Sequence, residues 1–185
     1  GRDGKGRIEA DLVIVKPRDI LQPDRAVADG LALTEPMVRS ELLDEIRTAL
    51  EQSFAAAPIV DGQDSKEAAE PYFAICPHDR RERLGTVSFA SRDTVQRAIA
   101  SAAAAAHRWD MTPVESRAAI LDAAADMFMR ERAKLMAVMV RETGKTLENA
   151  QADLREAVDF LRYYAQAGRK TFAKPSLLKG PTGER

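Results

Sequence analysis

Several features that would assign a protein to a familiar class are scarce or missing in this sequence. Cys76 is the one cysteine among 185 residues, so no disulfide can form within the chain and a reducing compartment is favoured. The two histidines, His78 and His107, give with it no known metal-ligand spacing, and we expect no metal site. Lys and Arg number 28 against 29 Asp and Glu, which leaves no basic footprint for nucleic acid or anionic lipid.

Long apolar runs are also absent, which excludes a transmembrane segment by sequence. The polar N-terminus, GRDGKG, has no apolar core behind it and is not typical of a signal peptide. We therefore expect a cytoplasmic protein. What the chain does contain, 45% hydrophobic and 31% charged residues, is typical of a globular domain.

A single cysteine in an intracellular protein raises the question of a catalytic nucleophile. Cys76 ends an apolar stretch, 72–76, and Pro77 follows it. An extended backbone would point His78 to the same side, but a proline turn intervenes, and no helix begins there to lower the thiol pKa. We expect Cys76 to be a packing residue at the end of a strand, rather than a nucleophile.

The first half of the chain predicts an arm, a helix and a hairpin. Residues 1–33 are polar, with an apolar burst at 12–15 that fits a short strand, and the rest reads as an extended interdomain arm. A helix segment, 34–56, is predicted to begin with Thr34 as N-cap and Pro36 in its first turn. Residues 57–70 show no clear pattern. After them, the apolar runs 72–76 and 84–89 flank a charged turn and predict a β-hairpin.

Three helices are predicted in the second half. Ser91 caps the first, which runs to about Trp109. Thr112 and Glu115 form a capping box before one long helix, or two end to end, that closes at Gly144. Thr146 caps the last helix, which ends near Gly168. The apolar stripe of the long helix comprises Ile120, Leu121, Ala124, Phe128, Leu135 and Met139.

Sequence motifs for nucleotide binding are not found. Gly144-Lys145-Thr146 lacks the earlier glycine of a phosphate loop, since Met139 occupies its place, and a helix boundary explains it better. On the last helix Asp153, Glu156 and Phe160 share one face, where carboxylates are usually a solvated surface. Taken alone, the residues predict an α/β segment rich in helix and name no reaction.

Four stretches nevertheless resemble one family. They are WDMTPVESRAAIL at 109–121, RETGKT at 141–146, EAVDFLRYYA at 156–165, and an arm segment with KPRDI at 16–20 and DGLAL at 29–33. The first three resemble the aldehyde dehydrogenase superfamily, and the sequence of the third is similar to that of proline utilization A proteins. The fourth resembles the segment that joins the proline dehydrogenase and aldehyde dehydrogenase halves of those proteins. The resemblance covers residues 16–185.

The resemblance implies an aldehyde-dehydrogenase-like α/β fold. Residues 57–185 would be the incomplete, helix-rich N-terminal part of the NAD-binding domain, with a short β-hairpin and most of the central sheet missing. The complete enzyme would oxidise L-glutamate γ-semialdehyde to glutamate with NAD, and a separate half would oxidise proline with FAD. In this family a cysteine thiolate attacks the aldehyde and a glutamate activates the hydrolytic water. Both residues, the oxyanion asparagine and the NAD-binding glycines are expected beyond Arg185, so this segment alone should be inactive and bind no cofactor.

Site residues carried over by the resemblance are few. The helix that holds Glu156 borders the aldehyde entrance in this superfamily, so Glu156 and, less directly, Asp153 and Phe160 are candidate substrate-channel residues. The simpler alternative is that Glu156 pairs with a neighbouring Arg or Lys. Expected partners are the remainder of the dehydrogenase chain and a second copy of this one, and the full protein could associate peripherally with membranes. The competing hypothesis is a non-catalytic helical scaffold or partner-binding module, which the intact gene would distinguish.

Overall fold

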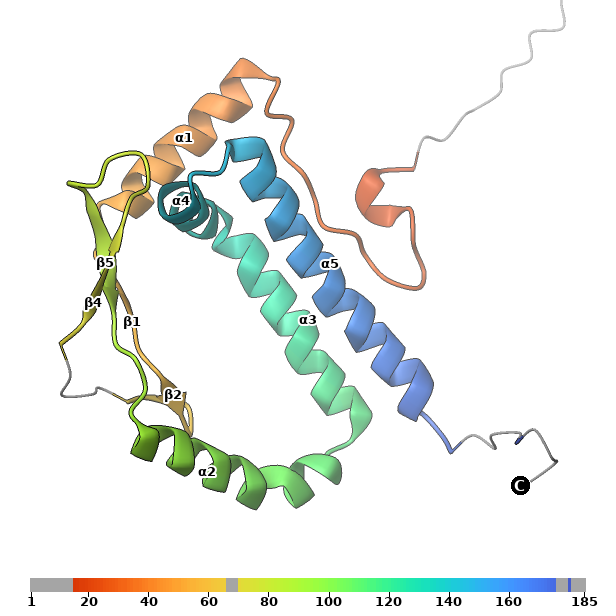
Figure 1. Cartoon of the computed structure of the whole chain (residues 1–185). Coiled ribbons are helices and arrows are strands. Elements are labelled where there is room, and N and C mark those ends of the chain that lie inside the picture. Colours follow the sequence, from red (N-terminus) through yellow and green to blue (C-terminus); the bar gives the residue numbers. More distant parts are fainter. Residues whose placement is uncertain (1–14, 66–69, 176–179, 181–185) are drawn as a thin grey trace, which may run out of the picture.

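A computed structural model describes residues 15–65, 70–175 and 180. Figure 1 shows two long antiparallel helices, α3 and α5, side by side, with α1 packed on α4 at one end of the pair. A small sheet stands apart from α3 and α5 with its hairpin beside α4, and α2 connects it to the other end of α3. The helices are α1 (Pro36–Leu50), α2 (Arg92–Asp110), α3 (Val114–Arg130), α4 (Arg132–Thr143) and α5 (Leu147–Phe172).

The strands form two small sheets. In one, β4 (Tyr72–Ile75) and β5 (Arg83–Val87) make the antiparallel hairpin that the sequence predicted, and β1 (Phe54–Ala56) adds to β5 in parallel. That third strand needs Gly85, because a Cβ there would overlap the Phe54 carbonyl oxygen. The other sheet pairs β2 (Ile59–Val60) with β3 (Gln63–Asp64), which the loose composition of this stretch did not predict.

The core lies between the arm, α1, α4 and α5. Leu42 of α1, Met136 of α4 and Val158 of α5 are fully buried there, and so is Ala28 of the arm. Each helix therefore contributes one apolar stripe at 3.6-residue spacing. Because Ala28 belongs to this core, the arm is a packed part of the structure and not a free tether. It also contains a 3₁₀ turn, η1 (Pro17–Asp19).

Most predicted helix ends are confirmed. The Ser91 hydroxyl accepts a hydrogen bond from the Thr94 amide at 3.2 Å, and the Thr146 hydroxyl accepts one from the Asn149 amide at 3.3 Å. Gly144 takes the left-handed conformation, with φ of 73°, that ends α4. The long helix is two helices end to end, because Glu131 interrupts it.

Other boundaries differ from the sequence prediction. The N-cap of α1 is Glu35 and not Thr34, since Pro36 takes the first helical position. The helix ends at Leu50, so the later part of 34–56 is strand β1. The last helix continues past Gly168 to Phe172. The strand predicted at 12–15 lies, apart from Val15, outside the described residues, and the division into domains stays a prediction.

The predicted capping box before α3 is wrong. Pro113 is the N-cap and no side chain bonds the first amides. The Thr112 hydroxyl instead donates to the Arg108 carbonyl at 2.9 Å, satisfying an unpaired carbonyl at the end of α2. Glu115 is held by Arg169 of α5 at 2.8 Å, which keeps it away from the helix start.

Candidate functional site

A pocket lies where the arm crosses α5. Its volume is about 470 Å³, within the range of small-ligand pockets. The arm contributes one side chain, Arg25, and α5 contributes the other six residues: Ala152, Arg155, Glu156, Asp159, Phe160 and Tyr163. The α5 residues recur at intervals of three and four and therefore form one stripe along the helix. Two of the three predicted channel residues, Glu156 and Phe160, are thus brought to the same pocket.

Three α5 side chains bind the backbone of the arm beside this pocket. The Asp159 carboxylate accepts a hydrogen bond from the Ala28 amide at 2.7 Å, and the Arg155 Nε donates to the Ala28 carbonyl at 3.3 Å. Gln151 makes two bonds to Leu31, accepting from its amide at 2.7 Å and donating to its carbonyl at 3.2 Å. These arm–α5 bonds fix the position of the arm along the helix.

The third predicted channel residue, Asp153, is placed elsewhere. Its carboxylate forms an ion pair with Lys145, in the turn that precedes α5. Glu156, in contrast, has no ion pair or side-chain hydrogen bond among the residues that the structure describes. The neighbouring Phe160 is half exposed and stacks on Tyr164, with ring centroids 6.0 Å apart. The assignment of these residues to a substrate channel remains a prediction.

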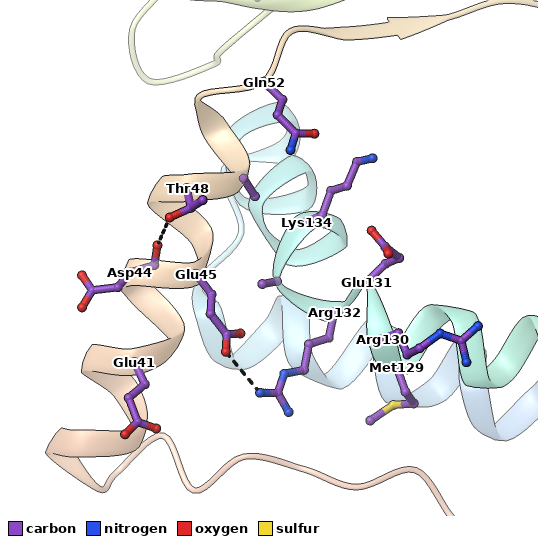
Figure 2. Close-up of a pocket in the computed structure, with 12 residues that line it drawn as sticks. Glu41, Asp44, Glu45, Thr48, Gln52, Met129, Arg130, Glu131, Arg132 and Lys134 are labelled. Atoms are coloured by element: carbon purple, nitrogen blue, oxygen red, sulfur yellow. Dashed lines mark hydrogen bonds and ion pairs between the residues drawn. The ribbon is translucent and has the colours of Figure 1, made fainter.

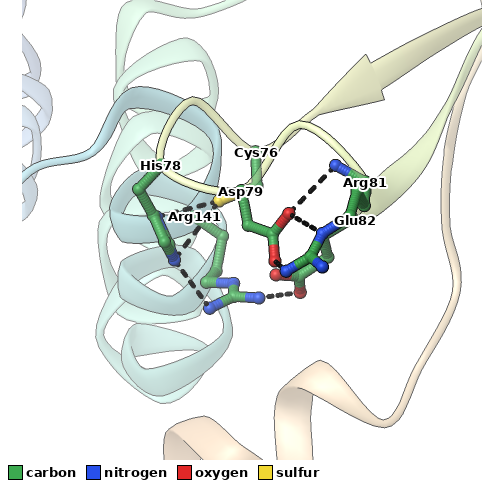
Figure 3. Close-up of polar contacts among 6 residues, drawn as sticks. All are labelled: Cys76, His78, Asp79, Arg81, Glu82 and Arg141. Atoms are coloured by element: carbon green, nitrogen blue, oxygen red, sulfur yellow. Dashed lines mark hydrogen bonds and ion pairs between the residues drawn. The ribbon is translucent and has the colours of Figure 1, made fainter.

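The hairpin turn forms a second polar cluster (Figure 3). Cys76 is fully buried, and its Sγ lies 3.0 Å from the Nδ1 of His78 despite the intervening proline. The carboxylate of Glu82 forms an ion pair with Arg141 of α4. The Nη1 of Arg141 lies 3.5 Å from the Nε2 of His78. These contacts join the hairpin to α4.

The same cluster contains three side chains that could bind a metal ion. The Sγ of Cys76, a ring nitrogen of His78 and a carboxylate oxygen of Glu82 lie within 4.8 Å of one another. Sulfur, nitrogen and oxygen ligands of this kind suit zinc. Each of them already has a partner, however, and a cation would have to displace Arg141 from Glu82. The contacts favour a structural cluster with Cys76 as a packing residue, and the absence of a metal stays a prediction.

One carboxylate of this turn has a shifted pKa. Hydrogen bonds from the side chain and the backbone amide of Arg81 hold the pKa of Asp79 below its usual value, with smaller contributions from the nearby charges of His78 and Arg141. Asp79 therefore stays ionised well into the acid range. It is partly exposed and stabilises the turn locally.

A groove of about 890 Å³ lies between α1 and α4 (Figure 2). Acidic residues of α1 form one wall, and basic residues around the start of α4 form the other. Glu45 and Arg132 pair across it at 3.6 Å. Such opposed walls hold α1 onto α4.

An apolar face extends over α3 and α5. Ile120 and Phe128, which belong to the predicted apolar stripe, are 54% and 37% exposed. Two shallow apolar pockets continue along this face, which we define by Trp109, Ile120, Leu121, Phe128, Phe160, Tyr164 and Phe172. No described helix is long and apolar enough to cross a membrane.

Arg25 is the site residue that sequence reasoning missed. It lies in the segment DRAV, which has no hydrophobic periodicity, and its neighbours in the pocket are about 130 positions further along the chain. A contact between residues so far apart in the sequence cannot be predicted from a local sequence pattern. The spacing of the α5 residues was visible in the sequence, but their partner was not.

Comparison with known proteins places this arrangement in context. Residues 63–181 match the aldehyde dehydrogenase family. Bifunctional protein PutA of Klebsiella aerogenes is 35% identical over 84% of this chain and 12% of its own length. 1-Pyrroline-5-carboxylate dehydrogenase 2 of Bacillus subtilis is 38% identical over 59% of this chain and 21% of its own. The crystal structure of 1-pyrroline-5-carboxylate dehydrogenase from Thermus with bound NAD superposes with a TM-score of 0.73 at 26% identity, over 83% of this chain and 30% of that one. The chain spans less than a third of each of these proteins.

Proposed function

Because this chain belongs to the aldehyde dehydrogenase family, we propose that it is part of an enzyme of proline catabolism. The complete enzyme oxidises L-glutamate γ-semialdehyde, the open form of 1-pyrroline-5-carboxylate, to L-glutamate with NAD. The relatives named 1-pyrroline-5-carboxylate dehydrogenase and PutA support this substrate. The observation that carries the proposal onto this chain is the pocket between the arm and α5. It is lined by Phe160 and by Glu156, which has no ion pair within the part of the chain that the structure describes.

The chain itself contributes binding and positioning. None of its described segments combines a strand, a glycine-rich turn and a helix start in the way that a dinucleotide site requires. We therefore assign no step through NAD to these residues, and the nicotinamide chemistry belongs to the remainder of the dehydrogenase. In a bifunctional protein, FAD would serve a separate proline dehydrogenase half. A cytoplasmic location accords with the single, unbridged cysteine.

Within this function, Glu156 and Phe160 form part of the substrate channel. The semialdehyde carries an ammonium group and a carboxylate at neutral pH, so an unpaired glutamate at the channel attracts the ammonium end. Asp153, which pairs with Lys145 in the turn before α5, acts on this region indirectly through the position of that turn.

The test is NADH formation by the complete protein that contains this chain. Purified enzyme should reduce NAD with L-glutamate γ-semialdehyde, whereas the 185-residue chain assayed in parallel should not. If the complete protein fails to oxidise the semialdehyde but oxidises other aldehydes, the substrate is wrong. If it reduces no NAD with any aldehyde, the scaffold alternative is preferred.

A further inference from the structure

Strand β4 is an edge strand with one unpaired side. The sheet order β1-β5-β4 places β5 beside it, and no strand within the described part of the chain lies on its other side (Figure 1). The Cys76 amide, directly after β4, donates to the Glu82 carbonyl at 3.1 Å, toward the β5 side. Because backbone groups alternate in direction along a strand, those of Phe73 and Ile75 point away from β5. Their amides and carbonyls are therefore left for another strand.

Charged residues, the usual protection of an edge strand against pairing with another chain, are missing from β4. The stretch between Pro71 and Pro77 contains none, and Phe73 and Ile75 are 39% and 43% exposed. The two prolines limit the stretch that can pair, because proline has no amide to donate. The edge thus favours one short and specific pairing over open-ended aggregation.

We propose that β4 pairs with β4 of a second copy of this chain, antiparallel and related by a twofold axis at Ala74, so that the two three-stranded sheets become one. In this register Phe73 of each copy lies opposite Ile75 of the other, and each outward amide meets an outward carbonyl. The side chains of these two residues also meet on one face of the sheet, where apolar cross-strand pairs are stabilising. Such pairing is self-complementary, as a symmetric dimer requires, and is independent of the reaction proposed above.

Charges at the two ends of β4 favour the antiparallel arrangement. Glu70, just before the strand, and Arg80, in the turn after it, are exposed and have no ion pair among the described residues. The one acidic neighbour of Arg80 in this turn, Asp79, is already bound by Arg81. Antiparallel pairing brings Glu70 of each copy toward Arg80 of the other, whereas parallel pairing would place like charges side by side. A second copy therefore supplies each residue with an opposite charge.

Disulfide cross-linking in the complete protein tests this pairing. In the proposed register the two Ala74 residues face each other in a non-hydrogen-bonded pair, with Cα atoms about 4.5 Å apart, which suits a disulfide. Under mild oxidation Ala74→Cys should form a covalent dimer about tenfold faster than Ala90→Cys, because pairing raises the effective concentration of the thiols. Ala90 is the matched control, since it is an exposed alanine outside the strands. The unmodified protein, treated in parallel, gives the background from its other cysteines, and equal rates for the two variants would overturn the proposal.

A proline substitution separates loss of edge pairing from damage to the hairpin. Ile75→Pro, added to the Ala74→Cys protein, removes an outward amide that β5 does not use, and proline is tolerated at such positions. Cross-linking should fall to the level of the control, while the Cys76 amide, bonded to Glu82, keeps its protection in hydrogen exchange measured by mass spectrometry. Phe73→Lys, which leaves every amide in place and puts a cation on the edge, should have the same effect. Undiminished cross-linking in either variant would show that the thiols meet through another contact.

Charge reversal tests the orientation of the two strands. Glu70→Arg in the Ala74→Cys protein should slow cross-linking about threefold, as expected for an exposed ion pair. Adding Arg80→Glu should restore the rate, because the opposite charges again lie at the same end. A parallel pair keeps like residues together and would respond to neither change. An unchanged rate in Glu70→Arg, or no recovery in the double variant, would rule out the antiparallel pairing.

Discussion

The attachment of the arm to α5 can be tested at one residue, Gln151. Its side chain makes two hydrogen bonds to Leu31, accepting from the amide at 2.7 Å and donating to the carbonyl at 3.2 Å. In Gln151→Ala both backbone groups lose their partner. A typical intramolecular hydrogen bond contributes about 1 kcal/mol net, so local opening of the arm should become easier by about 2 kcal/mol. That corresponds to roughly 30-fold faster exchange of the Leu31 amide.

Native-state hydrogen exchange measured by NMR is the assay, because the Leu31 amide is bonded to a side chain and reports this contact directly. Gln151→Glu separates the two bonds, since it keeps an acceptor for the amide but offers no donor to the carbonyl. It should therefore cost about half as much, or roughly a fivefold faster exchange. Glu148→Gln, at an exposed position in the first turn of α5, is the control and should leave the rate unchanged. Unaltered Leu31 exchange in Gln151→Ala would refute the reasoning that these bonds hold the arm.

Three further predictions concern stability and assembly. Gly144→Ala should destabilise the fold by about 1–2 kcal/mol in chemical denaturation because φ is positive there, whereas Gly168→Ala, inside α5, should stabilise it by about 0.5–1 kcal/mol. Hydrogen bonds from Arg169 lower the pKa of Glu115 in the folded protein. The contact therefore stabilises the fold at pH values above the pKa of Glu115 in the unfolded chain, and this stability is lost as the pH falls through its pKa in the folded protein. Arg169→Gln should raise the Glu115 pKa in an NMR titration. The 185-residue chain should self-associate in sedimentation velocity through its apolar face, and Ile120→Asp should reduce that association.

Sequence reasoning succeeded where the structure depends on neighbours in the chain. Ser91 and Thr146 cap their helices, and Gly144 ends α4, because these signals act over three or four residues. The hairpin was likewise visible as two apolar runs around a charged turn. Thr112 followed the same local rule and failed, since the nearby Arg108 carbonyl and the distant Arg169 took the two groups that the capping box needed.

Long-range pairing was beyond such rules. Strand β1 is three residues long and joins β5 only because Gly85 permits the close approach of Phe54. The apolar stripe of α3 was visible in the sequence as a pattern, but which of its residues stay exposed was not: no described element covers Ile120 and Phe128. For the candidate site, Glu156 and Phe160 could be chosen from a family resemblance, but Arg25 could not.

The two faces of α5 explain why the site depends on the arm. One face carries Leu154 and Val158 into the core, so the helix cannot rotate without exposing them. An adjacent stripe carries Gln151, Arg155 and Asp159 to the arm backbone, and their bonds fix the arm lengthwise. The charge of Arg25 is thus placed opposite a stripe whose orientation the core already determines. Residues about 130 positions apart therefore line one pocket, which neither α5 nor the arm forms alone.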